Sequence, residues 1–242
     1  MKTAILFLFF TVFSGISFAQ NQYLLLNQGM PVLTESALTL EQNEFQWGLG
    51  GSSRRSHTTG FGQVNYGILS NLEAFVNIGT YSGYSRSSDN FIDRIDAGLK
   101  YNINPGSKIF PLISFSAKYM PEFFGTDKIL LKAIATKSFG NVRTHLNLSN
   151  YFNEGWNERT FDAGGAIDYN FPNQKLLLVG EIVAHNFSNL EYSYHIGAKK
   201  QIGDSFVIYG GIGAMVSETI SPRKNISLGI NWYGFDWLGD LQ

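Results

Sequence analysis

The sequence has no cysteine, almost no net charge and no long apolar run after its N-terminal segment. The absence of cysteine excludes a disulfide framework and lipid attachment through an N-terminal cysteine. A formal net charge of −1 provides no overall field that would favour nucleic acid or an anionic surface as a partner. Since no later segment reaches the roughly 18 uninterrupted apolar residues of a spanning helix, any membrane crossing has to be made by strands.

The N-terminal segment predicts export. Lys2 precedes an apolar run, Ala4 to Phe13, and the small-residue pattern Ser17-Phe18-Ala19 follows. This order is typical of a secretory signal peptide, here residues 1–19, with cleavage expected before Gln20. The apolar run is too short to cross a bilayer comfortably as a helix, which disfavours the alternative of a retained membrane anchor.

What the sequence has in abundance is aromatic residues, at 15%, and glycine, at 26 residues. The mean hydropathy is nevertheless only −0.06. A near-neutral value is expected of transmembrane strands, because only every second residue of such a strand faces lipid. The length that remains after the signal peptide suits one all-β domain or a single barrel.

The stretch from Gly60 to Tyr81 shows the pattern that the rest of the chain repeats. Residues 61–68 and 72–81 alternate between two faces and are separated by the turn Leu69-Ser70-Asn71. Alternation with a period of two predicts strands. In the second strand, Leu72, Ala74, Val76 and Ile78 make a purely apolar face, whereas Glu73, Phe75, Asn77 and Gly79 make a mixed, partly polar one.

The alternation predicts about twelve strands, with approximate cores at 44–52, 59–68, 72–82, 92–103, 109–119, 128–138, 141–152, 160–171, 175–185, 190–201, 205–216 and 225–235. Connections after even-numbered strands are tight turns, and those after odd-numbered strands are mostly longer and polar. This asymmetry is typical of an outer-membrane barrel with both termini in the periplasm. We therefore predict an all-β fold, an up-and-down antiparallel transmembrane β-barrel over 44–235, with a periplasmic lead-in at 20–43 and a C-terminal tail at 236–242.

A soluble secreted β-sandwich is the alternative fold, since it also has short strands at regular spacing. It would need outward faces rich in Lys, Thr and Glu, whereas many of the faces opposite the apolar ones mix glycine with charge. Aromatic placement also favours the barrel, because Trp and Tyr gather at the two interfaces of a membrane. One predicted girdle, near the short turns, contains Phe45, Tyr66, Tyr101, Phe171, Phe206 and Trp232, and the other contains Tyr119, Phe152, Phe161 and Tyr192.

Three pieces of the chain resemble a known family: residues 33–49 (LTESALTLEQNEFQWGL), 64–68 (VNYGI) and 71–75 (NLEAF). The outer-membrane transporters grouped as the "MetA-pathway of phenol degradation" family open with a Thr-Glu-small-residue stretch and a strand of Phe-Gln-aromatic type. They continue with a Tyr-Gly-loop-Leu-Glu hairpin. The similarity covers roughly residues 33–82 and is architectural afterwards. It implies an outer-membrane transport barrel, its name suggests aromatic compounds, and it implies no ligand residues.

The faces opposite lipid predict a lumen that carries both signs of charge, which would hold water and pass small polar solutes, whereas rings of one sign would bias ion selectivity. The lumen-lining candidates are Glu73, Asn77, Arg94, Asp96, Lys100, Lys118, Lys132, Arg143, His145, Asp162, Asp168, Glu181, His195 and Lys199, with Glu44, His185 and Glu191 on the same faces. Barrels of about eight strands fill with side chains, and barrels of about sixteen to eighteen leave an aqueous channel. Twelve strands lie between, so both an open channel and an interior plugged by paired charges remain possible.

The run His145-Leu-Asn-Leu-Ser149 places His, Asn and Ser on one face of a strand, which suggests a lipid hydrolase. Residues two apart on a strand are separated by roughly 6.6 Å, whereas a nucleophile and its base need about 2.6–3.2 Å. The run His185-Asn-Phe-Ser-Asn189 lies at a loop and suits a turn. The histidines lack the close spacing of a metal site, and Gly210-Gly-Ile-Gly213 has no following helix that would make it a phosphate loop. We predict no catalytic residue, no metal and no cofactor.

The sequence thus predicts passive or facilitated passage of a small solute, aromatic or otherwise hydrophobic, across the outer membrane of a Gram-negative envelope. Outer-membrane lipids and the solute are the expected partners, and the oligomeric state is left open. Phe75, Tyr209, Met215 and Tyr233 lie among the lumen charges and support such a solute. A non-conducting structural or surface-binding barrel, active through its loops at 83–91 and 120–127, is the alternative. A lipid hydrolase is the third possibility.

Overall fold

The computed structural model describes residues 34–54, 57–83, 94–104, 106–107, 109–121, 127–153, 159–185, 191–217 and 223–234. The predicted signal peptide, 1–19, and the predicted tail, 236–242, lie outside these residues. The strands are β1 (Phe45–Arg54), β2 (His57–Leu69), β3 (Leu72–Gly83), β4 (Arg94–Asn104), β5 (Leu112–Met120), β6 (Lys128–Phe139), β7 (Val142–Asn153), β8 (Arg159–Phe171), β9 (Leu176–His185), β10 (Glu191–Ile202), β11 (Phe206–Ser217) and β12 (Arg223–Gly234). A short 3-10 helix, η2 (Pro172–Gln174), joins β8 to β9. Within the described ranges, no helix is long and apolar enough to cross a membrane.

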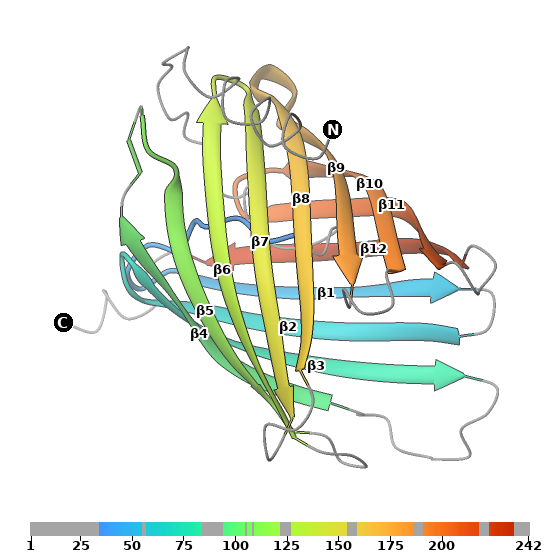
Figure 1. The fold of residues 1–242 in the computed structure, drawn as a ribbon. Helices are drawn as coiled ribbons and strands as arrows, with labels where there is room; N and C mark the ends of the chain where they lie inside the picture. The colour runs from blue at the N-terminus through green and yellow to red at the C-terminus, as the bar shows by residue number, and fades with distance from the viewer. Residues whose placement is uncertain are drawn as a thin grey trace, which may run out of the picture.

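The twelve strands close into one antiparallel barrel (Figure 1). Each strand pairs with its neighbours in sequence, and β1 pairs with β12 from Phe45↔Gly234 to Arg54↔Asn225. Closure leaves no unpaired sheet edge in the barrel. Because the number of strands is even, β1 begins and β12 ends at the same rim. The predicted all-β antiparallel barrel of about twelve strands is confirmed.

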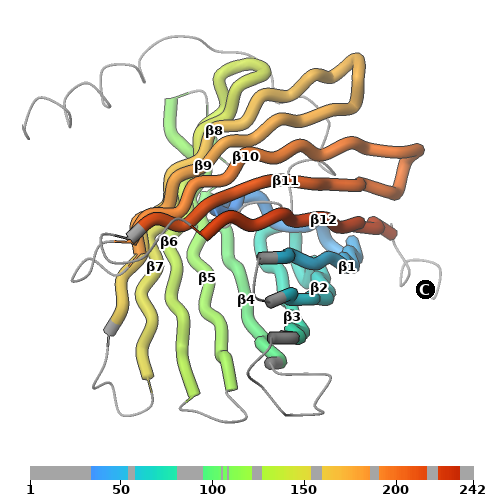
Figure 2. The backbone as a smooth tube through the Cα atoms, turned by 90° about the vertical axis from the view of Figure 1, so that its right-hand side faces the viewer, coloured from blue at the N-terminus to red at the C-terminus, as the bar shows by residue number. Residues whose placement is uncertain are grey.

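The strands are strongly tilted in the barrel. In Figure 1, β6, β7 and β8 of one wall cross β1, β2 and β3 of the opposite wall at a large angle, and Figure 2 shows the same tilt from the side. A sheet can close into a barrel only if its strands tilt and stagger. Side chains that are far apart in the sequence therefore face one another across the interior.

The strand boundaries follow the alternation of the sequence closely, and the largest difference is at β5. The sequence predicts this strand from residue 109, but β5 begins at Leu112. Pro111 stands directly before it and has no N–H to donate to the ladder. Ser107 Oγ instead accepts hydrogen bonds from the amides of Ile109 and Phe110, at 3.2 and 2.9 Å, which stabilises a turn. The connection predicted at 53–58 is shorter than expected, because β1 and β2 stay paired up to Arg54↔His57.

The two faces of the sheet are inverted relative to those of a soluble protein. Leu131, which points outward, is 44% exposed, whereas Asp96, which points inward, is 0% exposed. Near the rim where β1 begins, the Trp232 ring lies 6.2 Å from the Phe45 ring and 6.3 Å from the Trp47 ring, measured between centroids. An apolar outer face with aromatic clusters at its rim and a polar inner face suit a sheet surrounded by lipid.

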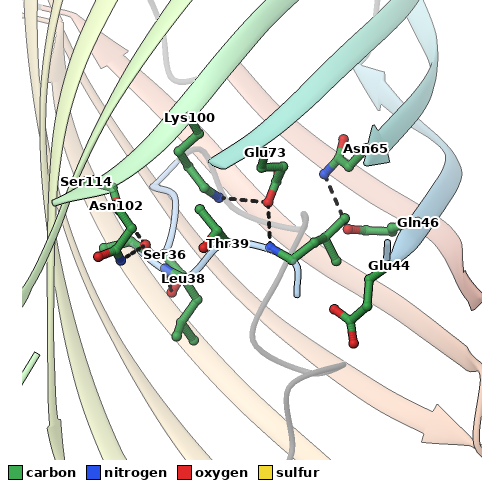
Figure 3. A network of polar contacts seen from close by, with 12 residues as sticks. Ser36, Leu38, Thr39, Glu44, Gln46, Asn65, Glu73, Lys100, Asn102 and Ser114 are labelled. Carbon is green, nitrogen blue, oxygen red and sulfur yellow. Dashed lines mark hydrogen bonds and ion pairs between the residues drawn. The ribbon is translucent and has the colours of Figure 1, made fainter. Parts of the chain in front are cut away.

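Residues Thr34–Leu40, which precede β1, run inside the barrel, and we call them the inner segment (Figure 3). The sequence predicts a periplasmic lead-in at 20–43, whereas this part of it occupies the interior. The stretch has no strand-like alternation, so no ladder satisfies its amides and inward-facing side chains do so instead. The amides of Thr34, Glu35, Ala37 and Leu40 donate to Glu181 Oε2 (2.7 Å), Asn147 Oδ1 (2.8 Å), Thr136 Oγ1 (2.9 Å) and Glu73 Oε2 (3.0 Å).

Two apolar side chains also attach the inner segment to the wall. Leu40 is 2% exposed and belongs to a cluster with Ala166, Leu177, Val179, Val207 and Tyr233. Ala37 is 0% exposed and packs with Leu112 and Ile134. Burial of a leucine side chain contributes about 1.5–3 kcal/mol. The described part of the barrel interior therefore has an apolar core that is built around the inner segment.

The chain leaves the interior through a turn that is fixed to β2. The Asn43 amide donates to the Gly67 carbonyl at 2.8 Å, and the Gly67 amide donates to the Glu44 carbonyl at 2.9 Å. Asn43 has a φ of 66°, a left-handed conformation that asparagine tolerates. Gly67 is required here, because a Cβ would overlap the Glu41 carbonyl oxygen. Burial raises the pKa of Glu44; the Glu41 amide, which donates to its carboxylate, opposes the shift, and the Glu41 and Glu73 charges add to it.

Candidate solute site inside the barrel

The predicted lumen residues occupy inward-facing positions of their strands. Glu73, Asp96, Lys100, Arg143, His145, Asp168, Glu181 and Lys199 are buried. Asn77, Lys118, Lys132, Asp162 and His195 are partly exposed. Arg94 begins β4 at an inward position opposite Gly79, and its side chain lies outside the described part of the structure. The barrel therefore brings together, around one space, charged residues that are up to about half the chain apart.

The interior contains a cavity of about 400 Å³. Thr34, Glu35 and Leu38 of the inner segment line it. Met120 and Tyr151, which lie at the far ends of β5 and β7, also line it. The cavity thus extends from the inner segment toward the rim of the longer loops. Its volume falls within the roughly 300–1,000 Å³ of small-molecule sites.

The wall made by β11, β12, β1 and β2 is thin and aromatic. The side chain of Tyr209 on β11 reaches over the two neighbouring strands, β12 and β1. A Cβ at Gly229 of β12 would overlap its ring and hydroxyl, and a Cβ at Gly50 of β1 would crowd the hydroxyl. Phe61 of β2 meets the same Gly50 and lines the cavity. Glycine permits this close approach of a ring to the backbone. The Tyr209 ring therefore packs against the backbone of this wall, where it is 5% exposed and lies outside the cavity lining.

The opposite wall is charged, and its charges are paired. Three adjacent strands, β4, β5 and β6, each carry a lysine that lines the cavity. Each lysine has a carboxylate partner: Lys100 Nζ lies 3.6 Å from Glu73 Oε2, Lys118 Nζ lies 3.4 Å from Asp96 Oδ2, and Lys132 pairs with Glu35 of the inner segment. Figure 3 shows the Lys100 ammonium against the Glu73 carboxylate, whose Oε2 also accepts the Leu40 amide. The lysine row is therefore close to neutral as a whole.

A second network connects the inner segment to a buried carboxylate. Arg143 Nε and Nη2 donate to Asp168 Oδ1 and Oδ2 at 2.9 and 2.7 Å, a bidentate pair. His145 Nε2 lies 2.9 Å from Asp168 Oδ2, and His145 Nδ1 lies 2.9 Å from Thr136 Oγ1. Since an ionised carboxylate only accepts, Nε2 carries a proton, and in the neutral imidazole Nδ1 then accepts from the Thr136 hydroxyl. The same hydroxyl accepts the amide of Ala37 at 2.9 Å, so the network holds the segment in place.

Three strands bring Ser193, His185 and Asp162 into a line. Ser193 Oγ lies 2.6 Å from His185 Nε2, and His185 Nδ1 lies 3.2 Å from Asp162 Oδ2. The order resembles that of a nucleophile, base and orienting acid. Sequence reasoning misses it, because it compares residues of one strand or one loop, and cross-strand register is not readable from alternation. Ser193 is 2% exposed and does not line the cavity, so a molecule held there does not reach its oxygen.

Within the described ranges, no group of three or more His, Cys, Asp or Glu side chains could hold a metal ion. His195 instead contacts Glu181, with Nδ1 at 2.8 Å from Oε1, and Glu181 Oε2 accepts the Thr34 amide. The inward-facing carboxylates of Glu73, Asp96, Asp168 and Glu181 contact lysine, arginine or histidine side chains, and Glu73 and Glu181 also accept amides of the inner segment.

Comparison with known proteins shows a shared fold. The chain is similar to the KdgM porin in complex with disordered oligogalacturonate (TM-score 0.61, 10% identity, 77% of this chain and 98% of that chain) and to the NanC porin (TM-score 0.61, 7% identity, 78% and 98%). It is also similar to the COG4313 outer membrane channel from Pseudomonas putida F1 (TM-score 0.59, 10% identity, 90% and 100%). At these identities the likeness concerns the fold alone. The chain has the fold of outer-membrane channels.

No protein-family model matches the sequence, and no curated protein matches it. The resemblance to the "MetA-pathway of phenol degradation" family therefore stays a prediction.

Proposed function

We propose that the protein is a channel of the outer membrane that passes a small organic solute by passive or facilitated diffusion. The observation that carries the proposal is a polar cavity of about 400 Å³ enclosed by a barrel whose outer face is apolar. The fold shared with porins supports it. Export through the signal peptide at residues 1–19 and insertion among outer-membrane lipids belong to the same proposal.

The composition of the cavity favours a solute with an aromatic or otherwise hydrophobic body. Phe61 of β2 and Phe75 of β3 line it next to the lysines of β4, β5 and β6, and the Phe75 ring lies over Gly98 of β4. A ring can contact the aromatic side chains with its faces or edges, while a polar group of the same molecule reaches the charged wall. The KdgM porin is in complex with oligogalacturonate, which is polar, whereas the solute proposed for this cavity has an apolar body.

The inner segment limits conduction, because it is hydrogen-bonded to side chains of β3, β6, β7 and β9. Passage therefore requires either the space left beside the segment or its displacement. The same anchoring favours the alternative function, a non-conducting barrel that binds a ligand from the long-loop side.

Single-channel recording in planar bilayers distinguishes the two functions. Mature protein is refolded in detergent, and folding is verified by heat-modifiable mobility on SDS gels. A channel gives discrete conductance steps, and Lys132→Glu or Arg94→Glu shifts its reversal potential toward cation selectivity. Bilayers that stay silent with verified, inserted protein would refute the channel and leave the binding barrel.

A further inference from the structure

The carboxylate of Glu35 differs from the other two in the lysine row by its attachment. Glu73 and Asp96 are strand residues with side chains only 3% and 0% exposed, so the sheet fixes them beside Lys100 and Lys118. Glu35 belongs to the inner segment, and its side chain is 44% exposed although it pairs with Lys132. Both Glu35 and Lys132 line the cavity. Their ion pair therefore lies at the cavity surface, where a molecule in the cavity reaches it.

The backbone of Glu35 is held independently of its side chain. Asn147 Oδ1 accepts the Glu35 amide at 2.8 Å, and Asn147 Nδ2 donates to the Glu35 carbonyl at 2.9 Å. The carboxylate can thus rotate away from Lys132 while the segment stays in place. The Glu35 carboxylate is 44% exposed and keeps contact with the cavity when it turns away, whereas the Lys132 side chain is only 10% exposed and needs a new partner.

The charge around Lys132 suits one carboxylate. Lys100 and Lys118, on the two strands before β6, add to the positive field at the Glu35 carboxylate. When Glu35 leaves, Lys132 loses its partner at a partly desolvated position, and an unpaired ammonium there is unfavourable. A carboxylate from a solute restores the ion pair at Lys132 and adds one negative charge to the lumen.

We propose that Lys132, with Lys100 and Lys118 beside it, is a binding site for the carboxylate of a small organic acid, and that Glu35 occupies this site as an internal competitor. The acid enters from the cavity, exchanges with Glu35 at Lys132 Nζ, and lays its apolar body toward Phe61 and Phe75, which line the same cavity. The inference rests on the proposed function, because it names the class of solute that the cavity takes.

Isothermal titration of the refolded full barrel in detergent tests the exchange, with benzoate as the acid and benzyl alcohol as its uncharged match. Glu35→Gln removes the competitor and should tighten benzoate binding by about two- to fivefold, the equivalent of one partly exposed ion pair. Lys132→Gln should weaken it by about tenfold, since it removes a charge-assisted hydrogen bond, and Lys132→Arg should retain it. Benzyl alcohol should bind equally to all of them.

Glu44→Gln is the matched control, because it makes the same charge change at the rim, outside the cavity lining. The inference is overturned if Glu35→Gln binds benzoate no more tightly than Glu44→Gln, or if benzyl alcohol responds to Lys132→Gln as benzoate does. Heat-modifiable mobility verifies the fold of every variant. The titration does not depend on conduction. A bilayer without conductance steps would therefore refute the channel alone, and benzoate binding that does not respond to these variants would refute the acid site alone.

Discussion

Asn147→Ala should release the inner segment and raise conductance. Asn147 makes two hydrogen bonds to the Glu35 backbone, at 2.8 and 2.9 Å. Each contributes about 0.5–1.5 kcal/mol, so their loss weakens attachment by about 1–3 kcal/mol. At a central value of about 2 kcal/mol, with about 1.4 kcal/mol for each factor of ten, the ratio of detached to attached segment rises roughly thirtyfold.

The assay is the fraction of time that single channels spend at high conductance. Ser149→Ala is the matched control, because Ser149 is the next inward-facing residue of β7 and also lines the cavity. If Asn147→Ala shows the same conductance distribution as Ser149→Ala, with both proteins folded, either the segment is not the constriction or the Asn147 clamp does not hold it.

Three further predictions test the faces of the barrel, the serine line and the thin wall. Leu131→Arg, on the outer face, should cost about 2–4 kcal/mol of unfolding free energy near the bilayer midplane, whereas Asn77→Arg in the lumen should cost less; urea unfolding in lipid vesicles measures both, and equal costs would contradict the assignment of faces. Ser193 should remain unlabelled by a fluorophosphonate probe in folded protein, because its oxygen is buried, and labelling detected by mass spectrometry would reopen the hydrolase. Gly229→Ala should destabilise the barrel by about 1–3 kcal/mol through overlap with Tyr209, and adding Tyr209→Ala should recover part of that loss in the same unfolding assay.

The sequence predicts the barrel well because period-two alternation is a local signal that each strand carries by itself. Val76 and Leu131 are placed outward and Glu73 and Asp96 inward by counting along the chain. The observed strands differ from the predicted ones where a residue such as proline cannot take part in the backbone ladder, although the apolar pattern continues. Residues 109–110 look like strand, yet Pro111 postpones β5 to Leu112.

The candidate site is only half predictable, because its contacts depend on register between strands. Alternation predicts that Lys132 faces the lumen. It does not predict the ion pair of Lys132 with Glu35, which lies 97 residues earlier in the sequence. The inner segment has no periodicity of its own, and its backbone hydrogen bonds go to side chains of six strands, β3, β4, β5, β6, β7 and β9. Ser193 and His185 are likewise brought together by the pairing of β10 with β9, where Ser193 stands opposite Val183.

The glycines under Tyr209 bear on how wide a barrel of this strand number can be inside. The width available inside is the inner width of the backbone barrel minus the space that the inward-facing side chains occupy. At Gly229 and Gly50 the ring and hydroxyl of Tyr209 approach the backbone where a Cβ would stand, so this side chain lies close to the wall. A larger residue at either position would push Tyr209 toward the interior without altering a single charge. In the proposed channel, the inner width beside β11, β12 and β1 and the charge of the lysine row can therefore change independently.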